Sequence, residues 1–359
     1  MQLALELAWI FKGTTSPNPT VGAVLVKNNH IINTGVTQPV GGYHAERMAL
    51  KDIPVKRSQG STLYVTLEPC TFHGRTPACT DIILEKKIKR VVIAHKDPHS
   101  KVNGRGIEIL RKAGISVDVG LYSKKAYQIN QDFFIALTKK RPFVTLKYAM
   151  TLDGKMASFS GDSKWITHSE SRKLTHLLRY RSDAIAVGKN TVNADDPTLN
   201  VRLFNREKSL LRVIFDPQGE VNMNFKVVQD EIPSLFVVKK TAPKEFIENI
   251  QCIPNKECYI DESNEPLIDL KSFLSYLYQE KKILSLFIEG GSFVLGNFLK
   301  EKCADYAFIF LGNQLLGEGL SPLNGFRTKF INEAAVLDDI KYKILSNNLL
   351  IHGCIKWKD

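Results

Sequence analysis

Four residues in the first part of the chain have side chains that can bind a metal ion and move a proton. They are His44 and Glu46, separated by one alanine, followed by Cys70 and Cys79. A catalytic zinc commonly has three protein ligands and leaves a fourth position for water, and one imidazole and two thiols supply that number. The combination predicts a hydrolytic zinc site with His44, Cys70 and Cys79 as metal ligands and Glu46 as the catalytic residue.

The order of these residues points to one kind of hydrolysis. A His-x-Glu motif followed by Pro-Cys and a further cysteine is typical of zinc-dependent deaminases. Each residue alone would be an ordinary core or surface residue, and a structural zinc would normally have four protein ligands. The conjunction favours catalysis, in which Glu46 passes the proton of a water to a ring nitrogen and then to the leaving ammonia.

The elements around this motif alternate between strands and helices, which predicts an α/β layered sheet. The predicted strands are 20–26, 31–36, 61–66, 90–94 and 115–119, and the predicted helices are 2–11, 44–51, 77–87, 106–113 and 123–139. A polar segment at 139–142 contains a proline, and the pattern restarts after it. We therefore expect two domains, 1–141 and 142–359.

The second part is also expected to alternate. Its predicted strands are 143–149, 184–187, 211–215, 234–238, 283–288 and 307–310, its predicted helices are 169–180 and 292–300, and its tail, 330–358, is expected to form short antiparallel strands. Glu289-Gly290-Gly291-Ser292 is a strand-to-helix junction that could bring backbone N–H groups to a phosphate. It is not a G-x-G-x-x-G fingerprint, and a tight turn is an equal interpretation.

Composition excludes several classes of protein. The chain has 359 residues, 43% of them hydrophobic and 24% charged, as in globular proteins. The sequence contains no run of 18 or more apolar residues, so it predicts no membrane span. Six cysteines are too sparse for a disulfide framework, which favours the reducing cytoplasm. The net charge of +12 could indicate nucleic acid, but the basic residues are scattered and fit phosphorylated small molecules better.

The spacing of the two cysteines narrows the range of possible substrate classes. Eight residues separate Cys70 from Cys79, whereas nucleoside and nucleic-acid deaminases typically have two. The intervening loop carries His73 and Arg75, which could reach a substrate phosphate. With Asn18-Pro19-Thr20-Val21-Gly22, Asp97-Pro98 and Gly104-Arg105-Gly106, this loop resembles the RibD (RibG) family of bifunctional deaminase–reductases of riboflavin biosynthesis. The resemblance extends over nearly the whole chain.

The resemblance implies a cytidine-deaminase-like domain followed by a dihydrofolate-reductase-like domain that uses NADPH. In the deaminase pocket it implies substrate contacts at Asn18, His44 and Arg75. Two departures affect this pocket: Phe72 stands where the family commonly has histidine, and Gly42-Tyr43 stand where it often has Glu-Pro. Whether the adjacent His73 replaces the displaced histidine is open at this point.

Resemblance also assigns roles in the second domain that the residues alone leave undecided, since Trp165, Arg179 and Asp195 are each compatible with a purely structural role. The implied NADPH contacts are Met150, Trp165, Thr191, Asp195, Gly291, Ser292, Phe293, Val294, Leu295, Gly296 and Asn297. The implied contacts to the phosphoribosyl substrate are Ser163, Arg179, Leu199, Arg202 and Glu289. No residue stands out as an obligatory proton donor.

The expected protein is therefore a cytoplasmic enzyme of flavin biosynthesis with one zinc ion and NADPH. Its expected partners are phosphoribosylated pyrimidines, with no nucleic acid and no membrane, and a homo-oligomer is expected through the reductase domain. Its first domain would deaminate 2,5-diamino-6-ribosylamino-4(3H)-pyrimidinone 5′-phosphate, and its second would reduce the ribosyl group of the product. One alternative is a nucleic-acid deaminase with a C-terminal binding module. Another is a deaminase whose second domain is an inactive dimerisation module.

Overall fold

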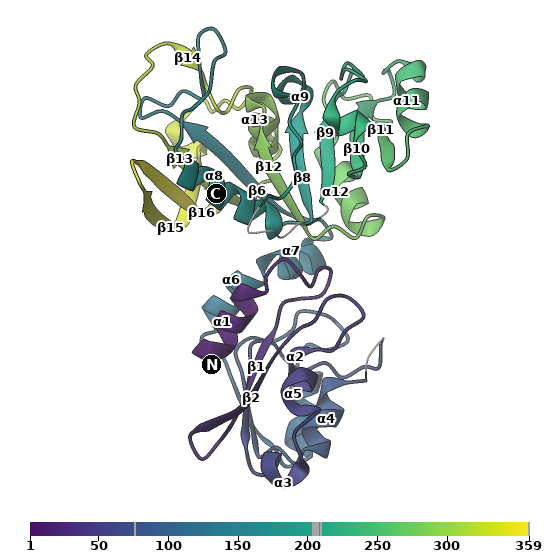
Figure 1. Ribbon diagram of the computed structural model, residues 1–359, viewed down its shortest axis with the longest axis vertical. Coiled ribbons are helices and arrows are strands. Elements are labelled where there is room, and N and C mark those ends of the chain that lie inside the picture. Colours follow the sequence, from purple (N-terminus) through teal and green to yellow (C-terminus); the bar gives the residue numbers. More distant parts are fainter. Residues whose placement is uncertain (75–76, 203–207, 209, 358–359) are drawn as a thin grey trace. The chain divides into compact units, whose positions relative to one another are not determined.

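The computed structural model describes residues 1–74, 77–202, 208 and 210–357. The chain divides into two compact units, Met1–Lys140 and Arg141–Asp359 (Figure 1). Each unit has its own sheet with helices on both faces, so the expected α/β class is confirmed. Among the described residues, no helix has the length and apolar character needed to cross a bilayer.

The first unit is built on a five-stranded sheet of order β2-β1-β3-β4-β5. Its strands are β1 (Gly22–Lys27), β2 (His30–Val36), β3 (Thr62–Val65), β4 (Arg90–Ile93) and β5 (Ser116–Val119). The turn between β1 and β2 consists of Asn28 and Asn29, both with positive φ, as a tight hairpin requires. Strand β1 is antiparallel to β2 and β3, while β3, β4 and β5 are parallel.

Different sets of helices cover the two faces of this sheet. Its helices are α1 (Gln2–Ile10), α2 (Ala45–Leu50), α3 (Val55–Ser58), α4 (Cys79–Glu85), α5 (Arg105–Lys112), α6 (Ser123–Ile129) and α7 (Gln131–Lys139). Helices α2, α4 and α5 share one apolar core with the strands. Helices α1 and α6 form a second, smaller core with Ala94 (Figure 1). The candidate zinc ligands belong to the first of these layers, at the starts of α2 and α4 and after β3.

The prediction of one helix over 123–139 was wrong, because the segment forms two helices that meet at Asn130. The Asn130 side chain is buried and pairs with the backbone of Thr20 in both directions. Its Oδ1 accepts from the Thr20 N–H at 2.9 Å, and its Nδ2 donates to the Thr20 carbonyl at 3.0 Å. This tertiary contact ends α6, and it fixes the segment that leads into β1.

The second unit is built on a nine-stranded sheet of order β11-β10-β9-β8-β12-β6-β13-β16-β15. Neighbouring strands are parallel from β11 to β13, and the β15–β16 hairpin adds two antiparallel strands. The strands are β6 (Phe143–Met150), β8 (Ala184–Gly188), β9 (Leu211–Phe215), β10 (Ser234–Lys239), β11 (Lys256–Asp261), β12 (Ser285–Gly290), β13 (Tyr306–Leu311), β15 (Ala335–Leu345) and β16 (Asn348–Trp357), with β7 (Ala157–Ser158) and β14 (Gly319–Leu320) paired separately. The tail is thus one long hairpin and not the expected short strands.

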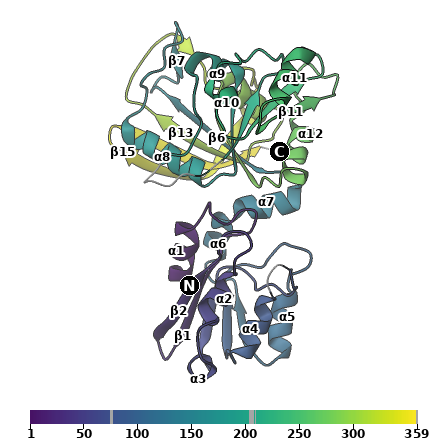
Figure 2. The same cartoon turned by 45° about the vertical axis from the view of Figure 1, so that its right-hand side comes forward.

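Strand β8 shows how this sheet is covered. Ala184 and Ala186 face a core shared with α12 and α13, while Ile185 and Val187 face a core shared with α9, α10 and α11. Figure 2 labels α9, α10, α11 and α12. Burial on both faces explains why the strand is an uninterrupted apolar run. The helices are α8 (Ser169–Tyr180), α9 (Lys189–Asp195), α10 (Lys226–Gln229), α11 (Lys244–Gln251), α12 (Leu270–Gln279), α13 (Ser292–Lys300) and the 3-10 turn Ile331–Glu333.

Helix α8 holds one end of the second unit together. Its Leu174 and Leu178 pack against Phe310 of β13 and against the β15–β16 hairpin. At its N-terminal end, the Asn348 Oδ1 accepts from the His168 N–H at 2.7 Å and from the Ser171 hydroxyl at 3.0 Å. The first turn of α8 is therefore capped by a residue of the C-terminal hairpin.

Candidate functional site

Three side chains from separate elements meet in the first unit. His44 immediately precedes α2, Cys70 follows β3, and Cys79 is the first residue of α4. The His44 Nδ1 lies 3.4 Å from the Cys70 Sγ and 3.3 Å from the Cys79 Sγ, and the three ligand atoms all lie within 4.8 Å of one another. Ligands of a tetrahedral zinc stand roughly 3.6 Å apart, given Zn–N and Zn–S bonds of about 2.1 and 2.3 Å. The donor set therefore fits one zinc ion.

Electrostatics favour a thiolate in this cluster. A hydrogen bond with Cys79, assisted by His44, lowers the pKa of Cys70 to about 5. The same hydrogen bond, together with burial, raises the pKa of Cys79. The Cys79 N–H also donates to the Cys70 Sγ at 3.3 Å. The lowered pKa favours the thiolate form of Cys70, which is the form in which cysteine binds metals.

Glu46 lies in the first turn of α2 and is only 4% exposed. Burial, followed by the charge of Cys70, raises the pKa of its carboxyl to about 7. A carboxyl group with this pKa exists in both protonation states near neutral pH, which suits a group that accepts and then returns a proton.

A second buried carboxylate, which the sequence did not single out for chemistry, organises the loop beside the cluster. Glu68 is 3% exposed and accepts from four backbone N–H groups. Its Oε2 accepts from Asp97 at 3.3 Å and Gly104 at 3.0 Å, and its Oε1 accepts from Gly106 at 3.0 Å and Ile107 at 3.3 Å. Glu68 thereby fixes the segment 97–107 and the start of α5.

The other residues predicted to contact the deaminase substrate lie in less defined surroundings. Asn18 is in the loop before β1, where its carbonyl accepts from the Thr15 hydroxyl at 3.0 Å. The His73 side chain is 70% exposed, and its Nε2 lies 3.0 Å from the Asp81 Oδ2 on α4. Arg75 lies outside the described residues. The described contacts do not join Asn18 or His73 to the three-residue cluster.

In the second unit, two residues predicted to bind substrate are paired with each other. The Arg179 guanidinium on α8 forms a bidentate ion pair with the carboxylate of Glu289 on β12, in which the Nη2–Oε2 distance is 2.8 Å. Its Nη1 donates to the Asn200 carbonyl at 2.9 Å. Both side chains are mostly buried. Arg179 therefore fixes the position of the Glu289 carboxylate.

Lys147 of β6 is a residue of this site that the sequence did not single out. Ile288 of β12 is paired with Leu146, so Glu289 and Lys147 lie beside each other on neighbouring strands. Burial lowers the pKa of the Lys147 ammonium, and the nearby Arg179 adds to this effect while Glu289 opposes it. The sequence does contain a feature that points to Lys147. It is the one charged residue in the largely apolar run Val-Thr-Leu-Lys-Tyr-Ala-Met, and buried strands rarely carry a charge.

The residues predicted to contact NADPH gather at one edge of the nine-stranded sheet. Strands β8, β12 and β6 are neighbours, and their carboxyl ends lead to α9, to α13 and from Met150 into the next loop. Between β12 and α13, Gly290 and Gly291 both have positive φ, and a Cβ on Gly291 would lie 3.7 Å from the Thr191 Oγ1. On α13, the Asn297 Oδ1 is buried and without a partner among the described atoms. Close backbone approach and a helix start fit a dinucleotide phosphate site, whereas the Asn297 Oδ1 requires a hydrogen-bond donor such as a hydroxyl or an amide.

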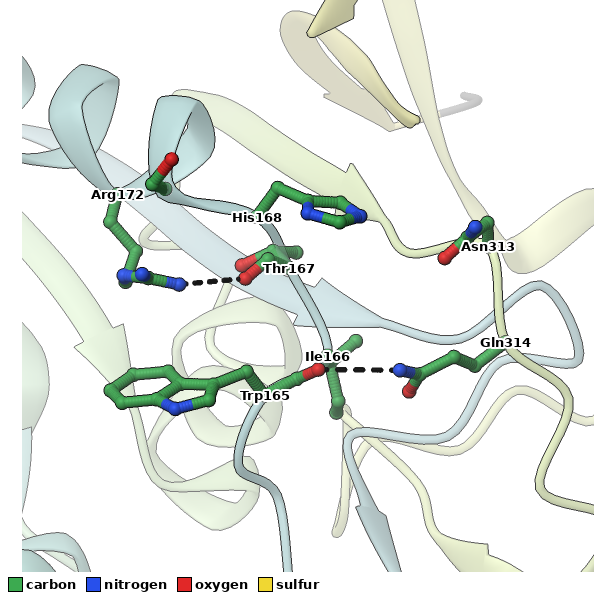
Figure 3. Close-up of a pocket in the computed structure, with 8 residues that line it drawn as sticks. Trp165, Ile166, Thr167, His168, Arg172, Asn313 and Gln314 are labelled. Carbon is green, nitrogen blue, oxygen red and sulfur yellow. Dashed lines mark hydrogen bonds between the residues drawn. The ribbon is translucent and has the colours of Figure 1, made fainter. Parts of the chain in front are cut away.

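Beside this edge is a cavity of about 330 Å³ (Figure 3). The Arg172 guanidinium lies 4.4 Å from the centroid of the Trp165 ring and donates to the Thr167 carbonyl at 2.9 Å. On the opposite side, the Gln314 amide donates to the Trp165 carbonyl at 3.3 Å. Arg172 thus lies over one face of the exposed indole, while Gln314 fixes the backbone of Trp165.

Four further predicted residues, Ser163, Asp195, Leu199 and Arg202, lie on or next to α8 and α9. The Lys164 Nζ lies 2.7 Å from the Asp195 Oδ1, which joins the segment of Ser163 and Trp165 to α9. Leu199 is buried. The Arg202 N–H donates to the His176 Nδ1 on α8 at 3.3 Å. The structure therefore places the segment of Ser163 against α9, and Arg202 against α8, the helix that carries Arg179.

Comparison with known proteins agrees with this division. The cytidine and deoxycytidylate deaminase zinc-binding region matches residues 1–95, and the RibD C-terminal domain matches residues 142–342. The riboflavin biosynthesis protein RibD of Aquifex aeolicus is 45% identical over 352 residues, which cover 98% of this chain and 96% of that protein. This chain belongs to the RibD family. The RibD protein of Escherichia coli is 35% identical over 342 residues, covering 90% of each chain.

Solved structures of the family share the fold over the whole length. RibD of Acinetobacter baumannii has a TM-score of 0.87 at 31% identity, covering 99% of this chain and 97% of that chain. A diaminohydroxyphosphoribosylaminopyrimidine deaminase/5-amino-6-(5-phosphoribosylamino)uracil reductase from Thermotoga maritima has a TM-score of 0.85 at 36% identity, with the same coverage. The expected pair of folds, cytidine-deaminase-like and RibD reductase-like, is confirmed, and so are zinc and NADPH as the cofactors.

Proposed function

We propose that this RibD family member catalyses two consecutive steps of riboflavin biosynthesis. The first is hydrolytic deamination of 2,5-diamino-6-ribosylamino-4(3H)-pyrimidinone 5′-phosphate to 5-amino-6-(5-phosphoribosylamino)uracil. The second is reduction of the ribosyl group of that product to ribityl with NADPH. The observation that carries the proposal is the cluster of His44, Cys70 and Cys79 with the buried Glu46, on the same chain as a RibD reductase unit.

We assign deamination to residues 1–141 and reduction to residues 142–359. The polar segment at 139–142 and the ranges matched by the two family models support this boundary. The assignment gives each activity its own sheet and its own apolar core.

In the deaminase unit, His44, Cys70 and Cys79 would hold the zinc ion. When bound there, zinc supplies a water activated for attack near neutral pH. Glu46 would accept one proton of the attacking water and pass it to the ring nitrogen beside the attacked carbon, and would then pass the second proton of that water to the amino group that leaves as ammonia. Burial raises the pKa of Glu46 to about 7, so near neutral pH this carboxyl group can both accept a proton and donate one. Asn18 and the His73–Arg75 loop are proposed to orient the substrate.

In the reductase unit, NADPH would lie against Met150, Trp165, Thr191, Asp195 and residues 291–297, and it supplies the hydride. The hydride adds to C1′ of the opened ribosyl group, and the attached nitrogen gains a proton. Lys147 is the proton donor that we assign, because its ammonium is buried beside Glu289 and has a lowered pKa. Glu289, which is fixed by Arg179 and lies on the strand beside Lys147, would orient the substrate.

Ser163, Leu199 and Arg202 complete the proposed reductase substrate site. Arg202 lies near His176 on α8, and the Arg179 guanidinium is already engaged by Glu289. We therefore assign the substrate phosphate chiefly to Arg202 and the orientation of the carboxylate to Arg179.

One assay separates the two steps. The full chain is given the diaminopyrimidine ribosyl phosphate with NADPH, and ammonia release is followed together with the near-ultraviolet absorbance of NADPH. We expect both signals. The Glu46→Gln variant should release no ammonia, retain zinc, and still oxidise NADPH when the deaminated compound is supplied. Ammonia release without any NADPH oxidation by the unaltered chain would contradict the bifunctional assignment.

We also propose self-association through the reductase unit and action in the cytoplasm. Strand β15 is the edge of the nine-stranded sheet, and it exposes Ile340, Tyr342 and Ile344 on one face, the last of them 78% exposed. Such an edge supports pairing with a second copy. All six cysteines are described and are free thiols, which supports a reducing compartment. Sedimentation of an Ile344→Lys variant tests the interface, and it should yield a smaller species than the unaltered chain.

A further inference from the structure

The loop that Glu68 organises is attached to the zinc-binding cluster. The Thr71 hydroxyl, one residue after Cys70, donates to the Lys101 carbonyl at 3.1 Å. Val102 is buried in one small core with Cys70 and Cys79. The side chains of residues 99–101 therefore lie at the rim of the deaminase site.

Three side chains gather at this rim. The Phe72 ring, 39% exposed, stacks on the His99 ring with a centroid separation of 5.9 Å and an interplanar angle of 30°. The Lys101 Nζ lies 5.8 Å from the centroid of the Phe72 ring. An imidazole from another loop is therefore held against the Phe72 ring.

One hydrogen bond of its own loop orients the His99 ring, and a second fixes the His99 backbone. Its Nδ1 accepts from the Lys101 N–H at 3.2 Å, and its backbone N–H donates to the Asp97 Oδ1 at 2.8 Å. Burial, together with the positive charges of Lys101 and Lys140, lowers the pKa of His99. A neutral imidazole that accepts at Nδ1 carries its proton on Nε2. His99 thus presents a fixed N–H donor beside the permanent charge of Lys101.

His73 is the other histidine available to this site, but its surroundings suit the role less well. It is largely exposed, and its Nε2 is engaged by Asp81 on α4. The ring of His99 is stacked and partly buried, whereas His73 is held by a carboxylate that would repel a phosphate.

The buried position of Glu46 determines which end of the substrate reaches the rim. The carbon that loses ammonia must reach Glu46 and the cluster, so the phosphate at the far end of the ribose must lie outward. We propose that His99 and Lys101, gathered around Phe72, form the phosphate-binding rim of the deaminase site. This proposal rests on the proposed function. A dianionic phosphate is a suitable partner for an imidazole N–H and an ammonium group.

Phosphate selectivity provides the kinetic test. The kcat/KM for ammonia release is measured for the phosphorylated substrate and for its dephosphorylated counterpart, in full-length chain with zinc. We expect His99→Ala and Lys101→Ala each to reduce the preference for the phosphorylated compound by about tenfold, the size of one hydrogen bond to a charged group. Lys96→Ala, an exposed lysine of the same loop, is the matched control and should leave the preference unchanged. Equal losses on both compounds would overturn the proposal.

A second measurement does not depend on turnover. The chain has eight histidines, and isotope labelling makes their ring signals visible by NMR. Inorganic phosphate is titrated, with the His99 signal assigned from the His99→Gln variant. We expect phosphate to shift this signal, and to shift it less in Lys101→Ala. If phosphate does not move the His99 signal, the phosphate-binding rim is rejected, even when ammonia release is normal. If the signal moves as expected but no ammonia is released, only the proposed function is rejected.

Discussion

Replacement of Glu68 tests whether one buried carboxylate supports the deaminase site. In Glu68→Ala, four backbone N–H groups lose their acceptor, and those of Asp97, Gly106 and Ile107 are buried. Each buried donor left unsatisfied costs about 1–3 kcal/mol, so the first unit should lose about 3 to 9 kcal/mol of stability. That corresponds to at least about a hundredfold change in its unfolding equilibrium. Glu68→Gln keeps one carbonyl oxygen and should lose roughly half as much.

Hydrogen exchange of the full chain, read by mass spectrometry, measures this effect locally. Peptides covering residues 103–108 should exchange much faster in Glu68→Ala, and urea unfolding of the first unit should occur at lower concentration. Glu85→Gln, at an exposed position on α4, is the control and should change neither result. A loss below about 1 kcal/mol with unchanged exchange in 103–108 would refute the argument, because water would then be replacing the carboxylate at little cost.

Three further predictions concern single side chains. Cys79→Ser should reduce zinc content and abolish ammonia release while NADPH oxidation with the deaminated compound continues; parallel loss of both activities would contradict separate sites. Lys147→Met should reduce hydride transfer at least about a hundredfold with unchanged NADPH affinity, and normal turnover would exclude Lys147 as proton donor. Burial raises the pKa of Asp97 from 3.8 to about 6, so the folded state binds the proton more tightly than the unfolded state. Stability of the first unit should therefore fall by up to about 3 kcal/mol as pH rises from 4 to 6, and Asp97→Asn should remove this dependence.

The deaminase cluster could be predicted from the sequence because its ligands lie in short motifs tied to element ends. His44 and Glu46 are two residues apart at a helix start, and Cys79 begins a helix, so local rules placed them. The rim could not be predicted. Contact between Phe72 and His99 depends on a loop that Glu68 fixes through backbone donors, and no spacing in the sequence encodes such a contact.

Contacts between residues that are distant in sequence, and strands without an apolar run, also limited what could be predicted elsewhere in the chain. Its parallel strands were predicted where they form apolar runs, but β11 was missed because Lys256–Asp261 is polar and pairs at an edge. The break at Asn130 was missed because it is caused by a hydrogen-bonded contact with Thr20, far away in sequence. The Arg179–Glu289 pair joins a helix to a strand through the tertiary fold, so the sequence indicated both residues without showing that they bind each other.

The cap that Asn348 provides for α8 has a consequence for biosynthesis of the protein. The helix that borders the Trp165 cavity is completed by a residue 180 positions after His168. During translation the first unit has all of its residues once about position 141 has emerged, whereas the second cannot close its cavity until β16 is made. At about 5–20 residues per second, the two events are separated by roughly 10 to 40 seconds. A nascent chain therefore passes through a period in which every residue of the first unit has been made while the second still lacks the residue that caps α8.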